Sequence, residues 1–115
     1  MNDHFWAFLN ERKNIYWKGF CRKNRNLCIY EIENIINRYG SIMDYKMFSD
    51  LEIGIKIEIA EQKVYKLHKD LVEIIEIEDF GDLKSESNTE RTILLNVTFL
   101  QGTGDMKIEG PIGPG

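Results

Sequence analysis

The strongest pattern in the chain is an alternation of apolar and polar residues from position 51 to position 59. The apolar positions are Leu51, Ile53, Ile55, Ile57 and Ile59. Charged residues and one glycine occupy the positions between them. Because successive side chains of a strand point to opposite faces, the pattern predicts a strand with one buried and one solvent-facing side.

Shorter alternations predict further strands at 15–22, 41–48, 74–80 and 92–100. Two segments show helical spacing instead. The first follows Asn26, which we expect to cap it, and ends at Gly40, where we expect a left-handed residue. Its apolar positions are Cys28, Ile29, Ile32, Ile35, Ile36 and Tyr39. The second helix is predicted from about 61 to 73, with Val64, Leu67 and Leu71 on its apolar side.

From 15 to 80 the predicted order is strand, helix, strand, strand, helix, strand. This is the split βαβ order of a ferredoxin-like α+β sandwich. It predicts a four-stranded antiparallel sheet with both helices on one face. The two-residue link Ser49-Asp50 predicts a hairpin between the second and third strands.

With 115 residues the chain is predicted to form a single domain, 1–115. Outside the 15–80 core we expect a short helix over 3–10 and a polar loop over 81–91. An extra strand or hairpin is expected over 92–109, where it would cover a sheet edge in the same chain or in a partner. The Gly- and Pro-containing stretch 110–115 is expected to be a flexible tail.

Composition favours a cytoplasmic globular protein. Hydrophobic residues make up 43% and charged residues 30% of the chain, and no apolar run is long enough to span a membrane. The start of the sequence has no secretory pattern. Cys21 and Cys28 are not spaced as a CxxC motif, so we expect two small core residues rather than a redox or zinc site.

The net charge of −4 is unevenly spread. Residues 1–25 hold six basic and two acidic residues, whereas residues 26–115 hold nine basic and seventeen acidic ones. Such asymmetry is typical of a binding surface, or of a basic arm that meets the acidic body of a second copy. We therefore expect a homo-oligomer, with a protein partner as a further possibility.

The aromatic and basic stretch at 16–25 is the best candidate binding site. Its candidate residues are Tyr16, Lys18, Phe20, Arg22, Lys23 and Arg25. Aromatic rings alternating with cations can stack bases and neutralise phosphates, as in single-stranded nucleic-acid binding. Against that use, the predicted neighbouring strand presents Glu52 and Glu58 on the same face. The competing interpretation is that other parts of the chain, or a second subunit, cover these aromatic rings.

No motif marks a nucleophile, a metal site or a cofactor site, and we predict no metal and no cofactor. The histidines, His4 and His68, are the candidate acid–base residues of an enzyme whose active site forms at a subunit interface. The element order over 15–80 resembles that of small ACT-like and PII-like regulatory modules. Three hypotheses follow: a non-catalytic binding or regulatory module, a single-stranded nucleic-acid-binding module, and a small interface enzyme.

Overall fold

The computed structural model describes residues 14–78 and 84–100. These residues form β1 (Asn14–Cys21), α2 (Arg25–Tyr39), β2 (Gly40–Ser49), β3 (Glu52–Ala60), α3 (Glu61–Leu71), β4 (Glu76–Ile77) and β5 (Glu90–Phe99). The predicted helix at 3–10, the second arm of the C-terminal hairpin and the tail at 110–115 lie outside the described residues.

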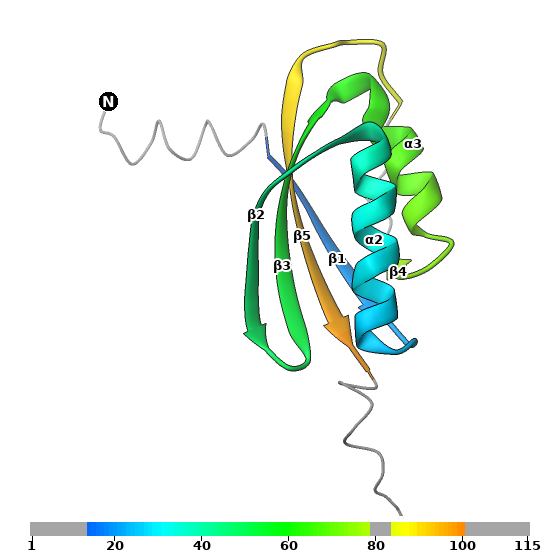
Figure 1. The fold of residues 1–115 in the computed structure, drawn as a ribbon. Coiled ribbons are helices and arrows are strands. Elements are labelled where there is room, and N and C mark those ends of the chain that lie inside the picture. Colours follow the sequence, from blue (N-terminus) through cyan, green and yellow to red (C-terminus); the bar gives the residue numbers. More distant parts are fainter. Residues whose placement is uncertain (1–13, 79–83, 101–115) are drawn as a thin grey trace, which may run out of the picture.

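The strands form one sheet in the order β2-β3-β5-β1-β4 (Figure 1). β1 and β5 run parallel, and the other neighbours are antiparallel. The prediction of an α+β fold is therefore confirmed, but the sheet is mixed and five-stranded, not antiparallel and four-stranded. The reason is the place of β5, which lies between β1 and β3. Since those two strands point in opposite directions, a strand inserted between them must run parallel to one of them.

The predicted role of the extra C-terminal strand as an edge cover is corrected for its described part, 92–100, by the same finding. β5 lies at the centre of the sheet, paired along its length with β1 on one side and β3 on the other. The edges of the described sheet are β2 and β4. Among the described residues β4 contains Glu76 and Ile77. It begins after the predicted residue 74, because the amides of Ile74 and Ile75 both donate to the carbonyl of Leu71 and prolong the turn after α3.

The core lies between the sheet and the two helices, which cover the same face (Figure 1). Alternate residues of β3 and β5 face the helices and are almost fully buried, at 2% exposure or less. They are Ile53, Ile55, Ile57, Ile59, Ile93, Leu95, Val97 and Phe99. Cys21 and Cys28 join this core as free, fully buried thiols, which confirms their predicted place.

The ends of α2 differ from the prediction in two details. Its N-cap is Asn24, whose side-chain oxygen accepts a hydrogen bond from the amide of Leu27 at 3.1 Å, and not Asn26. Gly40 follows the helix with φ −152° and ψ −156°, which is extended and not left-handed. Glycine is needed there for space, because a Cβ atom would lie 2.5 Å from the carbonyl oxygen of Glu58.

Candidate functional site on the open face of the sheet

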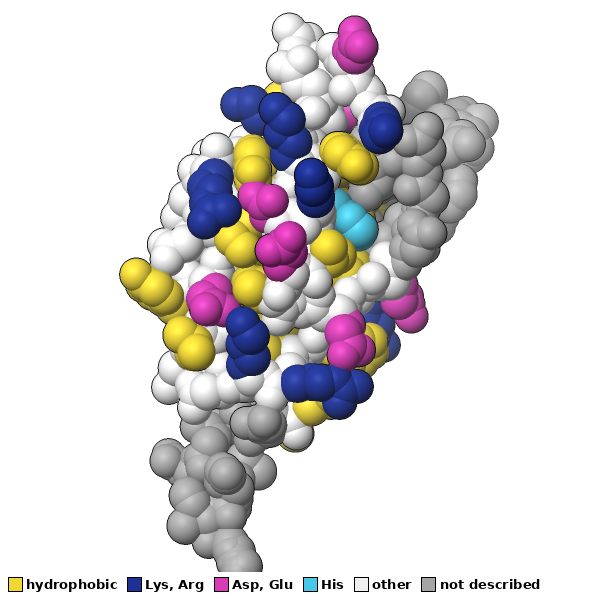
Figure 2. Space-filling view, turned by 90° about the vertical axis from the view of Figure 1, so that its right-hand side faces the viewer, with side chains coloured by type: hydrophobic (Ala, Val, Ile, Leu, Met, Phe, Trp, Pro, Cys, Tyr) yellow, Lys and Arg dark blue, Asp and Glu magenta, His cyan; other side chains and the backbone are white. Residues whose placement is uncertain are grey.

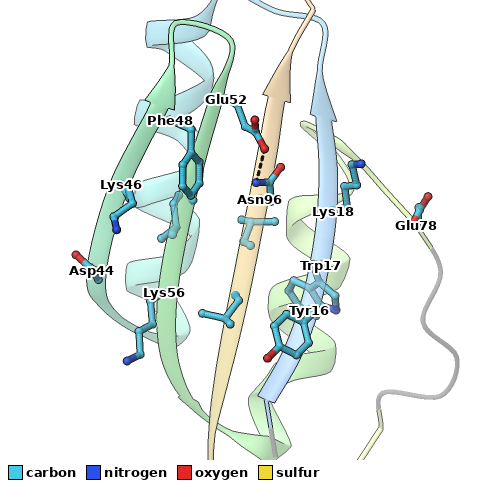
Figure 3. A pocket seen from close by; sticks show the side chains of 14 residues that line it. Tyr16, Trp17, Lys18, Asp44, Lys46, Phe48, Glu52, Lys56, Glu78 and Asn96 are labelled. Atoms are coloured by element: carbon cyan, nitrogen blue, oxygen red, sulfur yellow. Dashed lines mark hydrogen bonds between the residues drawn. The ribbon is translucent and has the colours of Figure 1, made fainter. Parts of the chain in front are cut away.

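The sheet face opposite the helices carries a pocket of about 620 Å³ (Figure 3). No element among residues 14–78 and 84–100 covers this face. The pocket is lined by side chains from β1, β2, β3 and β5, and from Glu78 beyond β4. Its volume is within the range of small-molecule sites in proteins.

The floor of the pocket is apolar and comes from the centre of the sheet. Leu94 of β5 lies between Tyr16 of β1 and Lys56 of β3 in the sheet register, and the rings of Tyr16 and Phe48 belong to the same lining (Figure 3). Both rings are about half exposed, at 50% and 56%. Phe48 lies against Gly54, where an added Cβ would be 2.9 Å from its ring, so this glycine provides the space in which the ring rests. The site therefore offers flat apolar surfaces that are open to a ligand.

Charged and polar groups surround this floor. The basic side chains are Lys18, Lys46 and Lys56, and the acidic ones are Asp44, Glu52 and Glu78. Two of the carboxylates already accept hydrogen bonds: Glu52 from Nδ2 of Asn96 at 2.7 Å, and Asp44 from the amide of Tyr45 at 2.9 Å. These bonds reduce the acceptor capacity of the carboxylates.

Asn96 supplies a polar group in the floor of the pocket. Its Nδ2 donates to Glu52, whereas its Oδ1 is buried and has no hydrogen-bond partner among the described residues. A buried acceptor without a partner is unfavourable by roughly 1–3 kcal/mol.

The structure separates the six predicted binding residues into two groups. Tyr16 and Lys18 line the pocket. Phe20 follows them on the same strand face, half-buried, and its ring centroid lies 5.9 Å from the Lys18 amine. This part of the aromatic and basic stretch is thus brought together with the groups from β2, β3 and β5.

The other three residues lie away from the pocket and have protein partners. Arg22 pairs with Glu76 at 2.6 Å, and Lys23 pairs with Glu31 at 3.0 Å. Arg25 begins α2 and is buried. Its guanidinium lies 5.6 Å from the centroid of the Phe99 ring and donates to Sδ of Met47 at 3.3 Å. These contacts link the end of β1 to β4 and α2 to β2, which accounts for part of the basic cluster.

The described histidine, His68, is half-buried in α3 and contacts the buried Trp17 edge-on, with ring centroids 5.1 Å apart. It does not line the pocket. His4 lies outside the described residues. Among the described residues no group of three or more His, Cys, Asp or Glu side chains is placed to hold a metal ion. Burial and the neighbouring Cys21 raise the pKa of the Cys28 thiol, which opposes a nucleophilic thiolate.

The helix-covered side of the molecule carries charged side chains of both signs. Basic and acidic side chains alternate over it without a patch of a single sign (Figure 2). None of the described helices is both long and apolar enough to cross a membrane.

Sequence reasoning missed the contribution of β5 to the site. Leu94 and Asn96 alternate with the buried residues of that strand, so their common face was readable, but nothing in the pattern placed the strand between β1 and β3. Phe48 and Lys46 were readable as one side of their strand. Only the order of the strands in the sheet brings them into the same pocket as Tyr16. Comparison with protein-family models, curated proteins and solved structures gives no match.

Proposed function

We propose that the protein is a non-catalytic binding module that holds a small ligand on the open face of its sheet. The observation that carries the proposal is the pocket of about 620 Å³, with an apolar floor formed by the central strand β5. The half-exposed Tyr16 and Phe48 in the lining support it, because they present apolar surface that a ligand would bury. A cytosolic location and assembly into a homo-oligomer belong to the same proposal.

The lining favours a ligand with a flat apolar body and an acidic group. Tyr16, Leu94 and Phe48 offer apolar surface, and flat rings stack well on exposed aromatic side chains. The amines of Lys18, Lys46 and Lys56 offer charge-assisted donors around this surface. Glu52 and Asp44 keep their negative charge, but each accepts a hydrogen bond within the protein, so the ligand that fits carries one acidic group next to a lysine rather than a chain of phosphates.

The fluorescent probe 1-anilinonaphthalene-8-sulfonate has this chemistry and provides the test. We expect the full chain to bind one probe molecule. Leu94→Trp should weaken this binding about tenfold or more, because the larger indole would occupy part of the pocket volume. Thr92→Trp is the matched control, since Thr92 lies on the same face of β5 but outside the pocket. Equal binding by the wild type and both variants, or no binding by any of them, would refute the site.

Native mass spectrometry of gently purified protein tests for the physiological ligand. A wild-type chain that retains a small molecule, together with a Leu94→Trp chain that loses it, would support the proposal and give the ligand mass. A wild-type chain without any retained molecule, combined with a negative probe experiment, would contradict it.

Single-stranded nucleic acid is the second candidate. Two exposed aromatic rings and three lysines on one open face favour it. Three carboxylates in the same lining oppose it, because they repel phosphates. Fluorescence anisotropy with a labelled oligouridine at low and high salt separates the two candidates. Salt-sensitive binding that is lost in Tyr16→Ala would favour nucleic acid, and no binding at low salt would exclude it.

The enzyme hypothesis receives less support from the structure. Its described acid–base candidate, His68, packs against Trp17 on the helix side of the sheet and not in the pocket.

A further inference from the structure

β2 is the longest edge strand among the described residues, and it is unusually apolar. It has ten residues, whereas β4 at the opposite edge has two. Five large apolar side chains in and directly after β2 are exposed: Met43, Tyr45, Met47, Phe48 and Leu51. Natural proteins usually protect such an edge with charges, proline or short length, because its backbone can pair with another strand. An exposed apolar edge of this length indicates a partner strand.

The sequence of β2 is complementary to itself when read in opposite directions from Tyr45. Residues at equal distance from Tyr45 are Asp44 and Lys46, Met43 and Met47, Ile42 and Phe48, and Ser41 and Ser49. The two inner pairs join residues of opposite charge, Asp44 and Lys46, and of the same kind, Met43 and Met47. The register shift between Ile42 and Asp44 places Ile42 on the helix side and Phe48 on the open face, so this outer pair does not contribute. Asp44 and Lys46 lie opposite Lys56 and Gly54 of β3, so both side chains are on the open face of the sheet.

From this we propose that two copies of the chain pair antiparallel through β2, about a two-fold axis at Tyr45. Such a dimer would join the two sheets into one, with Asp44 of each copy opposite Lys46 of the other. The proposal specifies the oligomer of the proposed function and rests on that part of it, but it does not depend on the ligand.

Only one register of a symmetric pair matches the charges. A two-fold axis perpendicular to the sheet places one residue opposite its own copy and keeps each side chain on its own face. An axis at Asp44 would oppose two carboxylates, and an axis at Lys46 would oppose two amines. The axis at Tyr45 creates two opposite-charge pairs instead. Like charges directly opposite in a sheet are destabilising, whereas opposite charges stabilise.

The local geometry of β2 agrees with a short, central pairing. Register irregularities lie between Ile42 and Asp44 and between Met47 and Ser49. The regular stretch between them contains Tyr45 and both charged residues. In the single chain the Asp44 carboxylate accepts a bond from the amide of Tyr45. Pairing would supply Lys46 of the second copy as a new partner for this carboxylate.

The dimer would also bring the two pockets together. Asp44, Lys46 and Phe48 line the pocket and belong to the paired strand. Each open face would therefore continue into the open face of the second copy, with charged groups of both chains at the boundary between the pockets.

Charge exchange tests this interface without relying on a single variant that fails to fold. We expect the wild-type chain of 115 residues to sediment as a dimer at about 50 µM in equilibrium centrifugation. Asp44→Lys and Lys46→Asp should each weaken the dimer about tenfold or more, because each creates two like-charge pairs. Glu73→Lys, with the same change of charge at an exposed position beyond α3, is the control and should leave the dimer unchanged.

Mixing provides the decisive measurement. Asp44→Lys and Lys46→Asp chains have matching charges only with each other, so an equal mixture should form a heterodimer although neither variant dimerises well alone. The double variant, which carries both exchanges, should dimerise nearly as well as the wild type. A wild-type monomer would overturn both the interface and the oligomer. A dimer whose dissociation constant is unchanged by both charge exchanges would overturn the interface alone. Neither result would affect the probe-binding test of the pocket.

Discussion

Two neighbouring leucines in β5 provide a sharp test of the fold and of the site together. Leu95 faces the helices and is 1% exposed, and the sheet register places it between Trp17 of β1 and Ile55 of β3. Leu94 points to the opposite face and lines the open pocket. The same substitution at these adjacent positions therefore removes the same atoms from a closed core and from an open surface.

The expected costs follow from burial. Leu95→Ala removes three buried carbon atoms, at about 0.8 kcal/mol each, and leaves a cavity that central strands cannot readily close. We expect a loss of about 3 kcal/mol in the free energy of unfolding. In a domain of this size that corresponds to a fall of roughly 10–20 °C in Tm. Leu94→Ala should cost about 1 kcal/mol or less, because its atoms border the pocket and no closed cavity forms.

Urea unfolding followed by tryptophan fluorescence, to which the buried Trp17 contributes, measures both variants. The same samples can be titrated with 1-anilinonaphthalene-8-sulfonate. We expect Leu95→Ala to be the destabilised variant and Leu94→Ala to be the variant with weakened probe binding. Equal destabilisation by the two substitutions, or a cost below about 1 kcal/mol at Leu95, would refute the placement of β5 at the centre of a one-sided core.

Further predictions concern the junction after α2, the start of α3 and the buried thiols. Gly40→Ala should cost about 1–3 kcal/mol in urea unfolding, because the new Cβ would meet the carbonyl oxygen of Glu58 and one strand must shift. Hydrogen bonds, first that donated by Ser85, lower the pKa of Glu61 below its ordinary value of 4.5. The ionised form of Glu61 therefore stabilises the fold above pH 4.5, and this contribution is lost as the pH falls below that value. The urea midpoints of the wild type and of Glu61→Gln should differ at pH 7 and converge in acid. Burial raises the pKa of the Cys28 thiol. A thiol reagent such as 5,5′-dithiobis(2-nitrobenzoate) should therefore leave Cys28 unmodified in the native protein at pH 8 and modify it in denaturant. Rapid modification of the native protein would contradict this burial.

The sequence by itself determined the two helices, the three long strands after β1 and the buried side of β3 and β5, although not the length of β4. The alternation from Ile53 to Ile59 and the helical spacing from Cys28 to Ile36 both correspond to buried residues in the structure. These patterns are local, because a strand or helix that lies on a core needs one apolar side whatever its neighbours are. The aromatic and basic stretch of the sequence likewise predicted two of the residues that line the pocket, Tyr16 and Lys18.

Only the tertiary structure decided the order of the strands, and with it the site. An apolar face shows that a strand packs on the core, but its two edges carry the same backbone groups, so the pattern of β5 fits an edge and a centre equally well. Its insertion between β1 and β3 made the sheet mixed, placed Leu94 and Asn96 on the pocket floor and left β2 as an exposed edge. Pairing between strands far apart in the chain depends on which backbone partners are still available once the helices have packed, and no local pattern of residues records that.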